Sequence, residues 1–306
     1  MERTISLINF RVPELHTNAY GFARSLLALS TLLTLLFNDT NILFAESVEL
    51  TPPTCQGLSQ ISIFCLLKPN LEVARWISIF ILLIIISGWR PKLTSIFHWW
   101  IAFSLNSTAL ILDGGDQVAT VLTLLLLPLA LTDSRKWVWS INKKPIDNHF
   151  TTETSSFISF AGLLLIKVQV AVIYFDASIE KFKVDEWLNG TALYYWFTNT
   201  YMGATESIKY ILNPFITNYI TTPILTWSVL LFEMILFLAV VMETKYRKKI
   251  MIVGILFHFV IALIHGLFPF FLSMAGALIL YLWPLQEEFS FLSKQTNKKL
   301  IKLQSV

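Results

Sequence analysis

Two carboxylates and a lysine end an apolar stretch near the middle of the chain. In the segment YFDASIEKFKVDEWLNG, residues 174–190, Asp176 and Glu180 are four residues apart, which places them on one face of an α-helix. Lys181 follows Glu180 directly. A lysine in a partly desolvated pocket loses its proton readily and can act as a base or a nucleophile, tuned by Asp176 or Glu180. A lysine that snorkels from a helix end and makes ordinary ion pairs has the same spacing, so both interpretations stay open.

Further ionisable residues are expected at the same edge of a membrane. The turn DGGDQ contains Asp113 and Asp116, and the apolar segment 249–267 ends close to His265. Glu233 and His258 lie inside apolar segments, and the sequence assigns them no role, because they could simply pair with each other. Convergence of titratable groups is typical of a functional site. The candidate catalytic residues are therefore Lys181, Asp176, Glu180, Asp113, Asp116 and His265.

Several familiar catalytic motifs are absent from the sequence. It contains no H-E-x-x-H, no G-x-S-x-G and no Walker loop, which argues against a metalloprotease, a serine hydrolase and a P-loop NTPase. The histidines and carboxylates do not have the spacing of a metal site, so we expect no metal. A transporter would more naturally show repeat symmetry, and no internal repeat is visible.

The composition indicates which elements must position these residues. Apolar residues make up 55% of the chain, charged residues only 14%, and the mean hydropathy is +0.63. A soluble domain carries roughly 25% charged residues. Here the charges lie in clumps between apolar stretches near the length of about 20 residues that crosses a bilayer. The sequence predicts an all-α, polytopic transmembrane helical bundle, forming one domain over residues 1–306 in the cell membrane.

Eight transmembrane spans are predicted, separated by two long segments on the outer side. The long outer segments cover residues 45–72 and 181–222. The net charge of +3 gives no reason to expect a nucleic-acid partner, because topology explains the basic residues. The predicted spans are residues 22–44, 73–89, 94–112, 117–132, 157–180, 223–242, 249–267 and 270–285.

The basic residues predict the orientation of the bundle. Sixteen Lys and Arg residues lie in the terminal regions and in alternate connections, whereas five lie in the remaining ones. By the positive-inside rule both termini are cytoplasmic. The region before the first span lacks the pattern of a cleaved signal peptide, so we expect that span to be retained. The sixteen are Arg3, Arg11, Arg90, Lys92, Arg135, Lys136, Lys143, Lys144, Lys245, Arg247, Lys248, Lys249, Lys294, Lys298, Lys299 and Lys302.

The two cysteines, Cys55 and Cys65, both lie in the first outer segment. A cysteine pair facing a non-cytosolic compartment is most simply a structural disulfide. Thiol exchange is the alternative, but the spacing is not C-x-x-C and no neighbouring group would activate a thiol.

The segment YFDASIEKFKVDEWLNGTALYYWF resembles the signature of the horizontally transferred transmembrane (HTTM) superfamily, which includes the vitamin K-dependent gamma-carboxylases. The turn and helix DGGDQVATVLTLLLLPLALTDS and the region from LLFEMILF to LFPFFLSM resemble the same pattern, and the likeness spans about residues 20–285. The positions that match the signature are Tyr174, Ala177, Ser178, Lys181, Trp187 and Gly190.

Within that superfamily, the chain resembles the sporulation-delaying protein B (SdpB) family nearly end to end. The opening RSLLALSTLLTLLFNDTNILF, the outer cysteines and the segments GWRPKLTSIFHWW and LDGGDQVATVL carry the likeness. The resemblance implies a bacterial membrane protein that matures a secreted toxin or antimicrobial peptide. Its implied partners are a small SdpA-like protein, the precursor peptide and membrane lipid.

The resemblance also implies a role for one residue. The carboxylase lysine that matches Lys181 is the base that deprotonates a reduced quinone. The carboxylases use a histidine in the region matching DGGDQV, where this chain has Asp116 and Gln117. They also carry a lumenal domain, which we do not expect in this chain. The sequence therefore supports two hypotheses: an enzyme with Lys181 as base and a reduced quinone as the implied cofactor, or a non-catalytic scaffold that presents the precursor to another enzyme.

Overall fold

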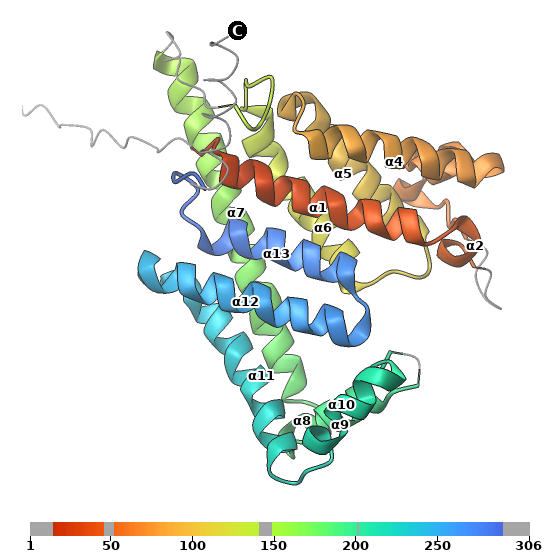
Figure 1. Ribbon diagram of the computed structural model, residues 1–306. Helices are drawn as coiled ribbons and strands as arrows, with labels where there is room; N and C mark the ends of the chain where they lie inside the picture. The colour runs from red at the N-terminus through yellow and green to blue at the C-terminus, as the bar shows by residue number, and fades with distance from the viewer. Residues whose placement is uncertain (1–14, 46–51, 141–148, 201, 290–306) are drawn as a thin grey trace, which may run out of the picture.

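The computed structural model describes residues 15–45, 52–140, 149–200 and 202–289, and within these ranges the chain is helical and contains no named β-strand (Figure 1). The longer helices are α1 (Asn18–Phe37), α4 (Leu71–Ser87), α5 (Pro91–Thr108), α6 (Gly114–Leu131), α7 (His149–Lys181), α10 (Glu206–Ile216), α11 (Thr221–Leu238), α12 (Thr244–His265) and α13 (Phe268–Leu282). The short helices are α2 (Thr40–Leu43), η1 (Gly57–Ile61), α3 (Ile63–Leu66), η2 (Lys68–Asn70), α8 (Asp185–Leu188), α9 (Ala192–Thr198) and η3 (Ala239–Val241).

The all-α fold class is confirmed, and each of the eight predicted spans overlaps one of the longer helices. Six segments of the described chain are long and apolar enough to cross a membrane. The other two predicted spans correspond to α5, with 18 residues, and α13, with 15 residues. The six segments are Asn18–Phe37, Lys68–Ser87, Gly114–Leu131, Thr154–Lys181, Thr221–Val241 and Thr244–His265.

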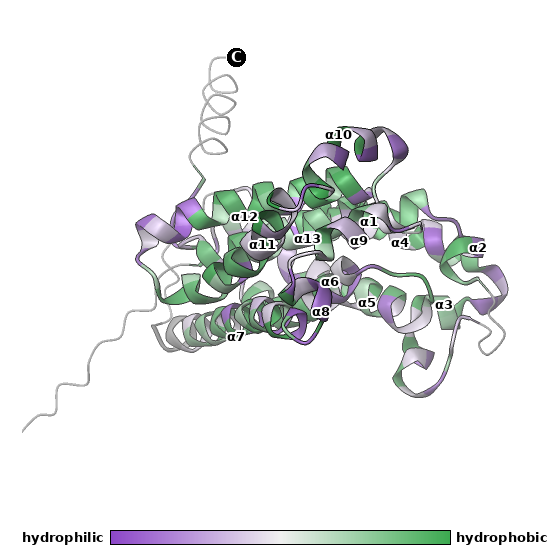
Figure 2. Cartoon of the chain, turned by 90° about the horizontal axis from the view of Figure 1, so that it is seen from below, coloured by the Kyte–Doolittle hydropathy of each residue, from purple (hydrophilic) through white to green (hydrophobic). Residues whose placement is uncertain are grey.

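Large apolar side chains remain exposed along these helices. Phe80, Leu165, Leu231 and Leu256 are all more than half exposed, although they lie in the middle of long helices. Figure 2 shows hydrophobic colour along most of the bundle and hydrophilic colour concentrated at helix ends and connections. A soluble protein rarely exposes so much contiguous apolar surface. The chain is therefore a membrane protein whose outer surface suits lipid.

The first span begins and ends earlier than predicted. Helix α1 ends at Phe37 rather than near residue 44, because the side chain of Asp39 accepts a hydrogen bond from the backbone N–H of Ile42 and starts α2. Arg75 of α4 donates to the last carbonyls of α1, on Leu35 and Leu36, at 2.6 and 3.1 Å. An aspartate N-cap and a charged C-cap thus set a boundary inside a stretch that is apolar on both sides.

One end of the bundle brings together the start of α1, the end of α13 and two connections; we call it the basic end. Thr17 donates to the carbonyl of Leu285 at 2.7 Å, and the backbone N–H of Arg90 donates to the carbonyl of Lys136 at 2.8 Å. Two basic connections therefore meet the first and last helices, as the predicted orientation requires. The remaining members of the basic set at 1–14, 141–148 and 290–306 lie outside the described residues, and the cytoplasmic location of this end stays a prediction.

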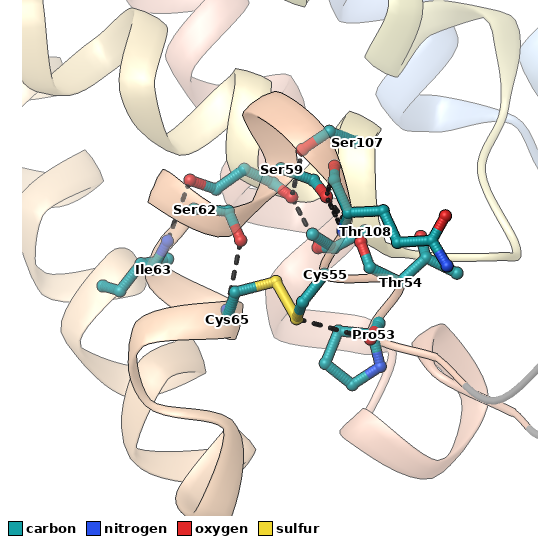
Figure 3. Close-up of a disulfide and its surroundings, with 11 residues drawn as sticks. Pro53, Thr54, Cys55, Ser59, Ser62, Ile63, Cys65, Ser107 and Thr108 are labelled. Carbon is teal, nitrogen blue, oxygen red and sulfur yellow. Dashed lines mark hydrogen bonds between the residues drawn. A yellow bond between two sulfur atoms is a disulfide. The ribbon is translucent and has the colours of Figure 1, made fainter.

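The opposite end carries the two cysteines; we call it the disulfide end. Cys55 and Cys65 are bonded, with their Cα atoms 5.7 Å apart (Figure 3). The Ser62 side chain accepts from the backbone N–H of Cys65 at 3.1 Å, and the Ile63 N–H donates to Ser104 on α5 at 3.1 Å. The bridge thus ties the segment before η1 to α3, and the hydrogen bond from Ile63 to Ser104 holds α3 against α5.

Helices α7, α11 and α12 form the side of the bundle that carries the candidate lysine. The short helices α8 and α9 turn back from the end of α7 and lie near the start of α11, with α10 beside them (Figure 1). Trp187 and Ala192 pack on Leu230 of α11. Gly190 permits the turn, because its φ is +82° and a Cβ there would lie 2.6 Å from Pro223. We call residues 185–198, which comprise α8 and α9, the roof.

Candidate functional site

The centre of the site is an ion pair between two helices that are far apart in sequence. The Lys181 amine, at the end of α7, donates to both carboxylate oxygens of Glu233 on α11, each at 2.8 Å. It also donates to the carbonyl of Ala177 at 3.1 Å, so the side chain points back along its own helix. The two side chains are 22% and 10% exposed, which leaves the amine partly accessible.

This pair lies beneath the roof rather than at the edge of the bundle. Glu233 comes twelve residues after Thr221, the first residue of α11, which corresponds to about 18 Å along a helix. The first turns of α11 pack against the roof, and the Trp187 ring lies 5.3 Å from the Lys181 amine in a cation–π arrangement. The roof therefore places an aromatic ring beside the amine on the side away from the bundle centre.

Two hydroxyl groups next to the pair have no hydrogen-bond partner among the described residues. They belong to Tyr174 and Ser178, which lie one turn apart on α7 and precede Lys181 by two turns and one turn. Tyr174 is 2% exposed and Ser178 is fully buried, and the tyrosine interacts electrostatically with Glu233. Buried hydroxyl groups are costly to leave unpaired.

His258 on α12 completes the aromatic wall of the site. Its ring centroid lies 6.0 Å from that of Tyr174 and 5.6 Å from that of Phe270, and it interacts electrostatically with Lys181. Its Nδ1 lies 2.8 Å from the carbonyl of Gly254. A carbonyl accepts, so Nδ1 carries the proton and Nε2 remains an acceptor. We call Lys181, Glu233, Tyr174, Ser178, His258 and Trp187 the Lys181 pocket.

The two carboxylates that the sequence placed nearest to Lys181 do not contact its amine. Asp176 and Glu180 are exposed, and Glu180 pairs instead with Lys183, whose side chain is 63% exposed. That contact raises the pKa of Lys183 above its usual value, chiefly through the hydrogen bond to Glu180. The expected tuning of Lys181 by Asp176 or Glu180 is thus replaced by Glu233, because the face of α7 that carries both acids points away from α11.

Asp113 and Asp116 form a helix cap. The Asp113 side chain accepts from the backbone N–H groups of Gly115 and Asp116, and the Asp116 side chain accepts in return from the Asp113 N–H. Thr34 of α1 donates to Asp116 at 3.0 Å. These contacts start α6 and hold it against α1. Within the described residues, no hydrogen bond or ion pair joins either aspartate to Lys181, and the contacts that both make are those of a helix cap.

His265 lies against the outer segment and not in the Lys181 pocket. Its Nδ1 is 2.7 Å from the carbonyl of Met202, and its ring centroid is 5.5 Å from that of Phe197 in α9. Of the two histidines on α12, His258 is the one that faces the lysine. In the described parts of the chain, no three His, Cys, Asp or Glu side chains lie together in a group that would hold a metal ion.

Two curated proteins of Bacillus subtilis (strain 168) are similar to nearly the whole chain. Sporulation-delaying protein SdpB is 40% identical over 277 residues, which cover 89% of this chain and 83% of that protein. The uncharacterized protein YitO is 38% identical over 281 residues, covering 90% and 88%. The chain belongs to the SdpB family. No family model matches the chain, and no solved structure matches it.

Sequence reasoning about this SdpB-family chain missed Glu233 and His258 as pocket residues. The signal for Glu233 was present, because a lone carboxylate inside an apolar helix requires a partner, and Lys181 was a cation at the end of a predicted span. The pairing requires α7 and α11 to be neighbours, which no local pattern shows.

Proposed function

We propose that this chain is a multi-pass protein of the cell membrane that matures a secreted toxin peptide, and that the Lys181 pocket carries out the chemistry. The SdpB-family membership supports the pathway, since one relative is named sporulation-delaying protein SdpB. The observation that carries the catalytic role is the pairing of the Lys181 amine with both oxygens of Glu233 in a partly open, aromatic pocket. A precursor peptide and a small SdpA-type protein are the proposed partners.

The Lys181–Glu233 pair suits a general base. In a pocket of low dielectric constant, one proton can sit on the carboxylate and leave the amine neutral, with the pair carrying no net charge in either form. When the amine then accepts a proton from a substrate, the pair becomes positive and balances the anion that is left behind. The hydroxyl groups of Tyr174 and Ser178, which have no hydrogen-bond partner among the described residues, would donate hydrogen bonds to that anion.

The resemblance to the HTTM superfamily implies a reduced quinone, and the residues present fit a flat aromatic ring that carries a hydroxyl group. The rings of Trp187 and His258 would hold the ring, and Tyr174 and Ser178 would bind its oxygen atoms. When bound, such a quinone would supply an ionisable hydroxyl and reducing equivalents. Lys181 would hold the released proton at Nζ, and Glu233 would orient the amine.

A second candidate function is a non-catalytic scaffold that presents the precursor to another processing enzyme. The specific observation that favours it is the same ion pair, because the contact between Lys181 and Glu233 joins α7 to α11 and would stabilise the bundle whether or not chemistry occurs. Membership of the family is compatible with both roles.

The deciding experiment replaces Lys181 by Ala in cells that secrete the peptide. Membrane abundance is measured by immunoblot, and the mass of the secreted peptide by mass spectrometry. We expect accumulation of the unmodified precursor, measured relative to the membrane abundance that each variant reaches, because the loss of Lys181 also leaves Glu233 without its partner. Lys183→Ala is the matched control, because Lys183 is two residues away and pairs with exposed Glu180. Full maturation by the Lys181→Ala protein would exclude the catalytic role.

A further inference from the structure

A second group of buried polar side chains lies near the basic end, between α1 and α5. Tyr20 and Arg24 are one turn apart on α1, and Thr94 and His98 are one turn apart on α5. The Nη2 atom of Arg24 donates to the Thr94 hydroxyl at 2.8 Å, so the two polar faces meet. All four residues are buried, with Arg24 only 1% exposed. We call them the Arg24 cluster.

The Arg24 cluster contains three polar atoms without a hydrogen-bond partner in the part of the chain that the structure describes. They are the Nε of Arg24, the Nε2 of His98 and the hydroxyl oxygen of Tyr20. Arg24 interacts electrostatically with both His98 and Tyr20, which places the three groups around one guanidinium. Each unpaired buried donor costs roughly 1–3 kcal/mol, so three in one place require compensation. A bound group that accepts hydrogen bonds would satisfy all three.

The net charge around the Arg24 cluster indicates the charge of the bound group. The nearest carboxylate, Asp133, already binds Arg135 through both oxygens, at 2.9 and 2.8 Å. No ion pair to Arg24 is formed by any residue of the described ranges. Arg24, Arg135 and Asp133 together therefore carry one net positive charge in a buried setting. A buried unpaired cation within a membrane protein is expensive, and one negative charge would balance it.

The segment from Asp133 to Ser140 closes the basic end below the cluster. Arg135 donates to the carbonyl of Val138 at 2.8 Å, and the Val138 N–H donates to the carbonyl of Gly88 at 2.9 Å. The Val138 side chain fills the space beside Gly21, where a Cβ would lie 2.7 Å away. This close packing holds the segment from Asp133 to Ser140 against α1.

We propose that the Arg24 cluster binds one small monovalent anion of halide size. The Nε–H of Arg24, the Nε2–H of His98 and the hydroxyl of Tyr20 donate to it, and its charge balances the guanidinium. The anion joins α1 to α5 near the basic end. The site is separate from the Lys181 pocket, so it stands whether or not the chain is an enzyme.

The test measures the melting temperature of the purified full-length protein in detergent. Sodium chloride replaces sodium gluconate at constant ionic strength, so that screening does not change. We expect the melting temperature to rise by several degrees and to saturate, as binding to the folded state requires. The Arg24→Gln protein should lose this response. Arg75→Gln is the matched control, because Arg75 is also buried but is bound by Leu35, Leu36 and Glu72.

Two results would overturn the proposal: no saturable chloride response in the unmodified protein, or an unchanged response in Arg24→Gln. If the Arg24→Gln protein does not fold, His98→Phe and Tyr20→Phe each remove one donor and leave the guanidinium in place. We expect each to raise the chloride concentration for half-saturation about tenfold, the cost of roughly one charge-assisted hydrogen bond. Half-saturation at the original concentration in both variants would also overturn it. Peptide maturation is not used as the readout, so failure here leaves the proposed function untouched.

Discussion

Two ion pairs with the same closest N–O distance have different surroundings. Lys181–Glu233 and Arg135–Asp133 both have a closest contact of 2.8 Å. Arg135 and Asp133 are two residues apart and 2% and 1% exposed, whereas Lys181 and Glu233 come from two helices and are 22% and 10% exposed. Arg135 uses its backbone N–H, its Nε and its Nη2 on Asp133 and its Nη1 on Val138. The first pair is partly open, and the second is enclosed.

We propose that this difference separates a structural pair, Arg135–Asp133, from a reactive one, Lys181–Glu233. A guanidinium whose donors are engaged fixes the conformation of a connection, and it has no further bond to offer a ligand. The Lys181 amine is partly accessible, and the hydroxyl groups of Tyr174 and Ser178 on the same helix have no partner among the described residues. We therefore expect changes in the first pair to alter stability, and changes in the second to alter activity.

The largest expected effect comes from removing both charges of the Lys181 pocket. Exchanging a buried ion pair for apolar residues of similar volume is often neutral or stabilising. The double variant Lys181→Met with Glu233→Leu should keep its melting temperature and lose peptide maturation by at least about 100-fold, the loss expected for a missing general base. Mass spectrometry of the secreted peptide and thermal melting of the purified protein measure the two effects.

Normal maturation by this double variant would mean that the Lys181–Glu233 pair is structural, as the Arg135–Asp133 pair is. It would show that the Lys181–Glu233 contact serves only to join α7 and α11, as the scaffold hypothesis requires. The single variant Glu233→Leu cannot replace the double one, since it leaves the lysine buried without a partner and confounds folding with activity.

The second prediction concerns the enclosed pair. Asp133→Ala leaves Arg135 buried without a carboxylate and should cost about 3–5 kcal/mol of unfolding free energy. The secreted peptide should keep its mature mass wherever folded protein remains. Denaturant titration gives the free energy, and Glu206→Gln is the control, because its partner Lys209 lies in an exposed pair that contributes about 0–1 kcal/mol. An Asp133→Ala protein with unchanged unfolding free energy would show that the Arg135–Asp133 pair does not stabilise the fold.

The Lys181–Glu233 pair shows how much of the candidate site could be predicted from the sequence. The helices that overlap the eight predicted spans follow from apolar stretches separated by charges. Lys181 was singled out by the motif in which it lies. The partner of Lys181 was sought among Asp176 and Glu180, its neighbours along the chain. Local spacing shows which residues share a face of α7, but which face meets α11 depends on packing between distant segments. Glu233 therefore could not be assigned.

The choice between the two histidines of α12 failed for a related reason. His265 was expected to be level with Lys181 because both end a predicted span. The lysine side chain points back toward Ala177, and α11 extends beyond the end of α7 to carry the roof. The amine consequently lies deeper than the chain ends suggest, beside His258. Depth in a bundle depends on helix offset and side-chain direction, and neither can be read from hydropathy.

A smaller effect is predicted for the unpaired hydroxyl groups of the Lys181 pocket. Tyr174→Phe and Ser178→Ala each remove a buried hydroxyl that has no partner in the described chain, so stability should be unchanged or slightly higher. Maturation should fall about tenfold if each hydroxyl binds the substrate, equivalent to one hydrogen bond. Initial rates of peptide maturation in membranes measure this. Tyr281→Phe is the control, because that hydroxyl donates to Leu236 and Phe237 and its removal should affect stability alone.

The smallest predicted effect distinguishes a capping carboxylate from a catalytic one at the disulfide end. Asp113→Ala removes the N-cap of α6 and should cost about 1 kcal/mol, whereas Asp113→Asn retains a good capping residue and should cost much less. Neither change should alter the mass of the mature peptide. Thermal melting and mass spectrometry of both variants check this. A stable Asp113→Asn protein that accumulates precursor would mean that the charge itself is needed, and the reactive region would then extend beyond the Lys181 pocket to the start of α6.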